Sequence, residues 1–139
     1  GGGGGIGPAQ HDLLRRMRHA VLATTGAAGS PHLAPVWYAW DGERFVVSTV
    51  RDTVKVADLR RDDRVAICVD DQVSGDYLTA YGRAELVEGE RVGELTRPLL
   101  LKYLHADEAE ARWSRIDAGG RRVAVLIRPD RVIWRAGVH

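Results

Sequence analysis

A long alternation near the middle of the chain restricts the possible folds more than any other feature. Between Asp76 and Val87 the residues alternate between two faces with a period of two, which predicts one long strand. We expect Gly82 to mark a bend, because glycine inside a strand often does so. One face carries Leu78, Ala80, Gly82, Ala84 and Leu86, and the other carries Tyr77, Thr79, Tyr81, Arg83 and Glu85.

Six further segments are predicted to be strands. They are rich in apolar, β-branched or aromatic residues, and residues with turn propensity separate them. Asp41 and Gly42 predict a hairpin, and Pro129 with Asp130 predicts a turn before the last strand. The six segments are 20–25, 31–40, 44–49, 64–70, 122–127 and 132–135.

Apolar residues at helical spacing predict four short helices. Asp52 is the expected N-cap of the second helix. Pro98 should kink or split the third helix, because proline has no backbone N–H. The expected helices run from Pro8 to about Arg18, from after Asp52 to about Arg61, from Val92 to Tyr103 and from Ala109 to Ile116.

The strands, joined mainly by hairpins, predict a mainly β fold. A closed antiparallel barrel with helices at its ends is expected, because closure removes exposed strand edges. Alternating strand–helix units are missing, which argues against a doubly wound sheet with a dinucleotide site. With 139 residues the chain has the length of one domain. We assign residues 9–139 to this domain and residues 1–8 to a disordered tail or a remnant of cloning.

Charge and cysteine content narrow the classes of function. Twenty Lys and Arg residues against nineteen Asp and Glu residues leave a net charge of +1, so no overall field attracts nucleic acid or an anionic membrane. Cys68 is the single cysteine, which excludes an intramolecular disulfide. Neither a secretory signal nor an apolar run of spanning length is seen, and the histidines lack metal-ligand spacing. We expect a cytoplasmic protein without a metal.

The segment from Ser48 to Lys55 combines groups that bind an anion. Ser48 and Thr49 end a strand, and Arg51 and Lys55 flank the start of a helix. A cation in the first turn opposes the helix macrodipole unless an anion is bound. Hydroxyls, free backbone N–H groups and an ammonium are suitable donors to a phosphate. A capped helix with solvated cations explains the same residues, and both interpretations stay open at this point.

Together with other segments, these residues resemble the pyridoxamine 5′-phosphate oxidase-like split β-barrel superfamily, and within it the flavin/deazaflavin oxidoreductases that use coenzyme F420. The resemblance extends from His19 to Arg135. It implies the fold of an FMN-binding split β-barrel with six to seven antiparallel strands. The residues that carry it are Ala20–Thr25, Gly29–His32, Pro35–Tyr38, Lys55–Asp62, Arg64, Val65, Tyr77, Gly82 and Ala84.

The resemblance also implies a cofactor site. The family's lysine that matches Lys55 binds the cofactor phosphate, usually with an arginine two residues earlier, where this chain has Thr53. Arg51 is the candidate to replace that arginine, and His32 is the candidate proton donor. The residues assigned to cofactor binding are Thr24, Pro35, Val36, Trp37, Ser48, Thr49, Arg51, Thr53, Lys55, Tyr77 and Thr79.

Two further interpretations concern an aromatic side chain and the paired arginines. Trp37 is expected in the barrel core or a dimer interface rather than on a cofactor ring. The arginine pairs, including Arg121 and Arg122, are interpreted as solvated surface. If folding gathers some arginines beside Lys55, they could instead hold a polyanionic cofactor tail, which F420 has and FMN lacks.

The resemblance implies a homodimer with shared cofactor grooves, in which Tyr77, Thr79, Trp134 and Arg135 reach the partner's cofactor. The implied activity is an F420-dependent reductase that transfers a hydride to a small conjugated acceptor. The cofactor then supplies the chemistry, which explains why no acid, base or nucleophile constellation is seen in the sequence. Two alternatives stay open: an FMN-dependent flavin reductase or oxidase on the same barrel, and a non-catalytic flavin- or haem-binding protein.

Overall fold

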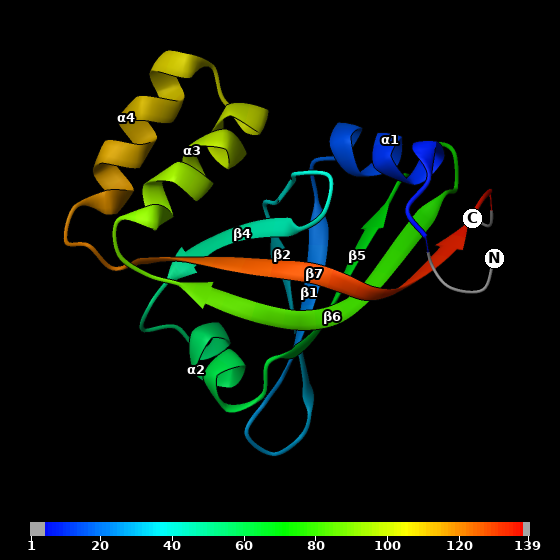
Figure 1. The fold of residues 1–139 in the computed structure, drawn as a ribbon, viewed down its shortest axis with the longest axis horizontal. Coiled ribbons are helices and arrows are strands. Elements are labelled where there is room, and N and C mark those ends of the chain that lie inside the picture. Colours follow the sequence, from blue (N-terminus) through cyan, green and yellow to red (C-terminus); the bar gives the residue numbers. More distant parts are fainter. Residues whose placement is uncertain (1–4, 138–139) are drawn as a thin grey trace.

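The computed structural model describes residues 5–137 and contains one seven-stranded antiparallel sheet that curls into a split barrel (Figure 1). The order of the strands is β2-β1-β5-β6-β7-β4-β3. Helices α3 and α4 lie side by side (Figure 1), and the C-terminal part of α3 reaches α1 through the hydrogen bond from Lys102 to the Leu14 carbonyl. The elements are α1 (Pro8–Arg16), β1 (Ala20–Thr25), β2 (Pro31–Val36), β3 (Ala39–Trp40), β4 (Phe45–Val50), α2 (Val54–Arg61), β5 (Arg64–Asp70), β6 (Tyr77–Val87), α3 (Arg91–Tyr103), α4 (Ala106–Asp117) and β7 (Arg122–Arg135).

The long alternation forms β6, which pairs with β5 on one side and β7 on the other. Its predicted bend is a β-bulge: the register to β7 shifts between Tyr81 and Gly82, and Gly82 lies opposite Pro129. A Cβ atom at Gly82 would lie 2.5 Å from the carbonyl oxygen of Arg128. Glycine is therefore needed here because two backbones approach closely.

β7 is one continuous strand, so the turn predicted at Pro129 and Asp130 is wrong. Asp130 is the residue left without a partner at the bulge. Pairing of β7 with β4 ends at Ile127, opposite Phe45, and beyond it β6 is the only strand neighbour of β7 in the described chain. Pro129 can therefore lie in the strand without removing a hydrogen bond on the β4 side.

The barrel is split where the predicted second strand is interrupted. Residues 31–40 form β2 and β3 rather than one strand, and Trp37 and Tyr38 connect them. These two strands are the edges of the sheet over residues 5–137, so no ladder between them closes the barrel, contrary to expectation. Tyr38 is fully buried beside the split, and its hydroxyl donates to the carbonyls of Leu14 and Met17. A core side chain and α1 thus cover the interior at this point.

Two predictions about helices are also corrected. The N-cap of α2 is Thr53 and not Asp52, because the Thr53 hydroxyl accepts a hydrogen bond from the N–H of Val56. α3 continues through Pro98 as a single helix. Residues of α3 on both sides of the proline are buried in a hydrophobic cluster, so tertiary packing outweighs the lost backbone hydrogen bond.

Two hydrophobic clusters lie on opposite faces of β4. The larger cluster fills the barrel interior and includes Phe45 and Val47. The smaller cluster lies under α3 and α4 and includes Val46 and Trp113. Because side chains alternate along a strand, every second residue of β4 faces α3 and α4. This alternation positions the site described below.

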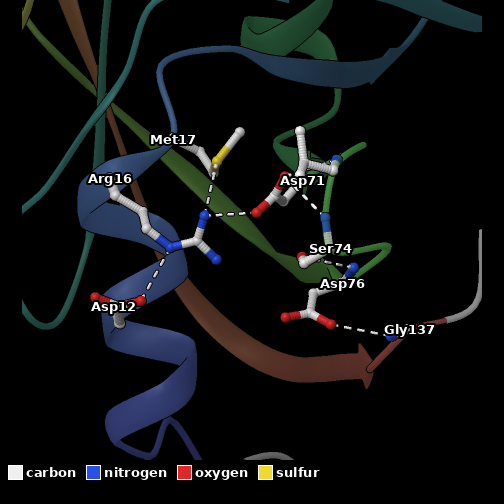
Figure 2. A network of polar contacts seen from close by, with 8 residues as sticks. Asp12, Arg16, Met17, Asp71, Ser74, Asp76 and Gly137 are labelled. Carbon is white, nitrogen blue, oxygen red and sulfur yellow. Dashed lines mark hydrogen bonds and ion pairs between the residues drawn. The ribbon is translucent and has the colours of Figure 1, made fainter.

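Arg16 fixes α1 to the hairpin between β5 and β6 (Figure 2). Its Nη1 donates to Oδ2 of Asp71 at 2.6 Å, and its Nε donates to Asp12 at 2.9 Å. Asp71 also accepts the backbone N–H groups of Val73 and Ser74 within the hairpin. The Arg16 guanidinium and these N–H groups lower the pKa of Asp71 to about 2.

Ordered structure begins earlier than the predicted start of the domain. Ile6 packs against the barrel core, and α1 begins at Pro8, so these residues are not part of a disordered tail. The first four residues of the expected tail and residues 138–139 lie outside the described part of the chain. Within the described part, no helix is long and apolar enough to cross a membrane.

Candidate functional site

A cavity of about 290 Å³ lies between the sheet and the helices α2, α3 and α4. It forms where β4 ends, β7 begins and α2 starts, and Figure 1 shows these three ends on the same side of the sheet. We call it the anion cavity, for reasons given below. It is lined by Pro35, Val36, Trp37, Ser48, Lys55, Thr96, Leu99, Leu100, Arg112, Ile116 and Arg122.

Three buried polar atoms in this cavity have no hydrogen-bond partner. They are Ser48 Oγ, Thr96 Oγ1 and Arg122 Nε, and no other buried side-chain nitrogen or oxygen among residues 5–137 is left unpaired. A buried polar group without a partner costs about 1–3 kcal/mol. A polar ligand in the cavity would satisfy these groups, which identifies the cavity as the best candidate for a binding site.

The charges in the cavity select an anion. Burial lowers the pKa of Lys55, and the positive charge of Arg122 lowers it further. Burial also lowers the pKa of Arg122. Over the part of the chain that the structure describes, neither cation forms an ion pair with a carboxylate. Two partly buried cations without a counter-charge create a positive potential that an anionic ligand would neutralise.

The alternation of β4 decides which of the two predicted hydroxyls faces the cavity. Ser48 lies opposite Ala124, on the face that packs under α3. Thr49 lies opposite Val123 and points to the other face, where it is 8% exposed. Only Ser48 therefore lines the anion cavity.

The start of α2 brings Lys55 to the cavity. Thr53 caps the helix, so Lys55 is the second residue of α2 and lies in its first turn. The positive end of the helix dipole faces the same region, and it favours negative charge there. The predicted first-turn position of Lys55 is confirmed, although the capping residue is different.

Aromatic stacking holds a third cation at the cavity. The ring of Trp37 stacks on Tyr103 with centroids 4.2 Å apart and an interplanar angle of 4°. The guanidinium of Arg112, on α4, lies 5.8 Å from the centroid of Trp37. Tyr103 is itself fixed, because its hydroxyl accepts the N–H of Tyr38 and donates to the Tyr38 carbonyl. Trp37 therefore supports a charged wall of the cavity.

The other predicted residues lie outside the anion cavity. Arg51 is exposed, and Thr53 serves as the helix cap. Asp52 forms a 2.6 Å ion pair with Arg121. Tyr77 and Thr79 lie at the start of β6 and do not line the cavity, which forms at the end of β4 and the start of α2. The position of Arg51 does not support the idea that it replaces the arginine missing at Thr53.

Thr24 and His32 meet at a different place, around the buried carboxylate of Asp58. Thr24 donates to Asp58 Oδ2 at 3.4 Å, and His32 Nδ1 lies 3.6 Å from the same oxygen. Arg61 donates to the other carboxylate oxygen at 2.8 Å. This cluster ties α2 to β1 and β2 and leaves His32 away from the anion cavity.

Sequence reasoning missed Arg122, Thr96 and Arg112. The interpretation of the pair Arg121–Arg122 as solvated surface is correct for Arg121, which is exposed, but wrong for Arg122. A signal was present, since Arg122 directly precedes five apolar residues of a buried strand. Thr96 and Arg112 lie on helices whose packing no local pattern revealed. Among residues 5–137 no group of three or more His, Cys, Asp or Glu side chains is placed to hold a metal.

Comparison with known proteins gives a family and several relatives. The model of a family described as pyridoxamine 5′-phosphate oxidase matches residues 6–134. A 5a,11a-dehydrotetracycline/5a,11a-dehydrooxytetracycline reductase of Streptomyces rimosus is 42% identical over 62 residues. That match covers 42% of this chain and 44% of the reductase, so it spans less than half of the relative.

Solved structures share the fold over most of the chain. A conserved hypothetical protein from Mycobacterium tuberculosis has a TM-score of 0.83 and 27% identity, with 96% of this chain and 87% of that chain covered. A structure described as an F420 reductase has a TM-score of 0.70 and 27% identity, with coverages of 88% and 94%. These similarities confirm the predicted split-barrel fold.

Proposed function

This chain belongs to the pyridoxamine 5′-phosphate oxidase family, and from this premise we propose that it is an oxidoreductase that uses coenzyme F420 to transfer a hydride to a small conjugated acceptor. The observation that carries the proposal is the anion cavity, where Lys55 and Arg122 converge with the unpaired hydroxyls of Ser48 and Thr96. Two cations and two hydroxyls form a donor set that suits a phosphate group.

Each of these residues has a role in the proposal. Lys55 and Arg122 bind the cofactor phosphate, and Ser48 and Thr96 complete its hydrogen bonds. Arg122 thereby takes the place of the arginine that the family resemblance expects at Thr53. The deazaflavin supplies the hydride chemistry when it is bound. The protein's contribution is to hold the anionic end, fix the orientation of the ring and keep water out.

Two features favour F420 over FMN, and a third supports the reductase activity itself. Arg112 adds a third cation beside the phosphate-binding pair, as a cofactor with a polyanionic tail requires. The similarity to the F420 reductase structure covers 88% of this chain. The curated relative, a dehydrotetracycline/dehydrooxytetracycline reductase, supports a reductase activity with either cofactor.

A second copy of the chain completes the site in this proposal. The anion cavity, at about 290 Å³, lies at the lower end of the range for ligand pockets, so it accounts for the anionic end of the cofactor rather than its ring. Apolar side chains lie on the outer face of β1 and β2, where Val21 is 42% and Leu33 is 64% exposed. We expect a homodimer that covers such residues and uses Tyr77, Thr79, Trp134 and Arg135 toward the partner's cofactor.

Titration of the purified protein with F420 and with FMN tests the proposal. We expect F420 to bind at least tenfold more tightly, which corresponds to about 1.4 kcal/mol. Protein loaded with reduced F420 should then be reoxidised by a quinone or another conjugated carbonyl compound, followed by absorbance. Tighter binding of FMN would favour the flavin reductase or oxidase alternative. Tight F420 binding without reoxidation by any acceptor of a broad panel would favour the non-catalytic alternative.

A further inference from the structure

A second cavity, of about 320 Å³, lies between α1, the β3–β4 hairpin and α3. It shares no lining residue with the anion cavity. Its wall is largely apolar and is formed by Trp40, Val46, Leu95 and Pro98. One of the chain's two lysines, Lys102, lines it as well. We call it the lysine cavity.

The amino group of Lys102 has an unusual set of neighbours. Its Nζ lies 3.6 Å from the centroid of the Tyr38 ring and 5.7 Å from that of Tyr103. It donates one hydrogen bond, of 3.2 Å, to the carbonyl of Leu14. Within residues 5–137 it forms no ion pair with a carboxylate. The amino group is thus held in place by two rings and a carbonyl, without a counter-ion, on a side chain that lines the cavity.

The charged groups around Lys102 do not supply that counter-ion. Arg15 lines the same cavity, and the charge of Arg18 acts on Lys102 from the segment after α1. The carboxylate of Asp41 is occupied by the backbone N–H groups of the hairpin and by the Arg44 side chain. Glu94 lies two turns before Lys102 on α3 and is exposed. The two tyrosines that face the amino group are neutral, since burial raises the pKa of both hydroxyls.

We propose that Lys102 is a nucleophilic amine that forms an imine with small uncharged aldehydes, whose aryl or alkyl body binds the apolar wall of the lysine cavity. The Nζ lone pair attacks the aldehyde carbon, and a C–N bond forms. The C–O bond then breaks, and the oxygen leaves as water with the two hydrogens of the amino group. The product is a C=N bond, and nothing is oxidised or reduced.

The protonation state of Lys102 supports this chemistry. Burial lowers the pKa of its amino group to about 8, and the charge of Arg18 contributes to the decrease. At pH 8 about half of the side chain is therefore the free amine, which is the nucleophilic form. An ordinary surface lysine with a pKa near 10.4 is almost wholly protonated at that pH.

Reductive alkylation of the full chain tests the proposal. The protein is incubated at pH 8 with limiting benzaldehyde and sodium cyanoborohydride, and benzylated sites are located by peptide mass spectrometry. The competing amines are Lys55 and the chain's amino terminus. We expect Lys102 to be benzylated at least tenfold faster than Lys55. Equal labelling of the two lysines, or faster labelling of Lys55, would overturn the proposal.

Comparison of two aldehydes separates binding in the cavity from general reactivity. Formaldehyde has no aryl or alkyl group that could bind the apolar wall. The ratio of labelling at Lys102 to labelling at the amino terminus should therefore be at least fivefold higher with benzaldehyde than with formaldehyde. This measurement needs no variant. An equal ratio for both aldehydes would show that the cavity does not recognise the aldehyde and would contradict the proposal.

Two variants serve as matched controls. Lys102→Arg keeps the positive charge but cannot form an imine, so benzylation of this segment should disappear while the amino terminus still reacts. Glu94→Trp places a large ring at an exposed position of the cavity wall, and it should reduce benzylation of Lys102 but not its methylation by formaldehyde. Unchanged benzylation in a folded Glu94→Trp protein, judged by circular dichroism, would count against binding at this wall.

Discussion

Lys55 on α2 and Arg122 on β7 line the same cavity, and the charge of Arg122 lowers the pKa of Lys55. Because burial and a like charge both disfavour a protonated lysine, the ligand-free protein carries an electrostatic cost at this position. A bound anion would remove that cost. The stability of the fold and the affinity for an anion are therefore coupled at this pair.

Replacement of Lys55 by Met should weaken cofactor binding and leave the fold intact. A charge-assisted hydrogen bond contributes about 1.5–3 kcal/mol, so the affinity should fall by roughly one to two orders of magnitude. The pKa of Lys55 in the folded protein lies below the usual 10.5. The charged side chain therefore destabilises the fold fully at pH values below the folded-state pKa, and this effect disappears as the pH rises toward 10.5. Thermal unfolding without ligand should show a variant at least as stable as the parent at pH 7. Unchanged affinity in a folded variant would remove Lys55 from the site.

Replacement by alanine should lower the cofactor affinity much more at Arg122 than at Arg51. Arg122→Ala is expected to lower cofactor affinity about as much as the loss of Lys55, because its guanidinium lines the anion cavity. Arg51→Ala should change the affinity less than threefold, because Arg51 is exposed and does not line the cavity. Isothermal titration of both variants measures the difference. A large loss for Arg51→Ala alone would restore the idea that Arg51 is the phosphate-binding arginine.

Gly82→Ala should destabilise the barrel. The added Cβ would lie 2.5 Å from the Arg128 carbonyl oxygen, so one strand must move at the bulge. Such overpacking costs about 1–3 kcal/mol. We expect unfolding at a lower midpoint concentration of urea, with an unchanged dependence of the free energy of unfolding on urea concentration. Gly5→Ala is the control, because a Cβ there meets nothing within 4 Å.

Asp71→Asn should reduce stability at neutral pH and lose its effect in acid. The Arg16 hydrogen bond lowers the pKa of Asp71 to about 2, below the ordinary value of 3.8. The carboxylate therefore stabilises the fold above pH 3.8, and this contribution disappears as the pH falls through about 2. Melting temperatures of parent and variant should differ at pH 7 and converge near pH 2. A constant difference over this range would contradict the assignment.

Tyr103→Phe should loosen the split in the barrel. The hydroxyl accepts the Tyr38 N–H at 2.9 Å and donates to the Tyr38 carbonyl at 3.1 Å, so its loss leaves both backbone groups without that partner. An unsatisfied buried group costs about 1–3 kcal/mol. Hydrogen exchange at the Tyr38 amide should become faster, whereas the amide of Ile67 in the interior strand β5 should be unaffected.

Local patterns predicted most of the secondary structure. The strands at 20–25 and 64–70 were predicted with their observed ends, because apolar alternation and flanking polar residues both mark them. The errors occurred where a tertiary contact overrides a local signal. Pro129 predicts a turn, but it lies in β7, beyond the point where β4 pairs with that strand. Pro98 predicts a break in the helix, but the packing of buried residues on both sides of the proline stabilises α3 as one helix.

For the site, the sequence alone determined the existence of a first-turn lysine beside a strand that ends in hydroxyls. Alternation, hairpin residues and helical spacing are local properties of the chain, and they predicted a mainly antiparallel β fold with short helices, whereas the split barrel was implied by the family resemblance. Only the tertiary structure decided which groups share the cavity. The face of β4 selects Ser48 over Thr49, and the start of β7 supplies Arg122 in place of Arg51. The physical reason is that strand pairing and helix packing join distant segments, and no local pattern records which face of a strand a helix will cover.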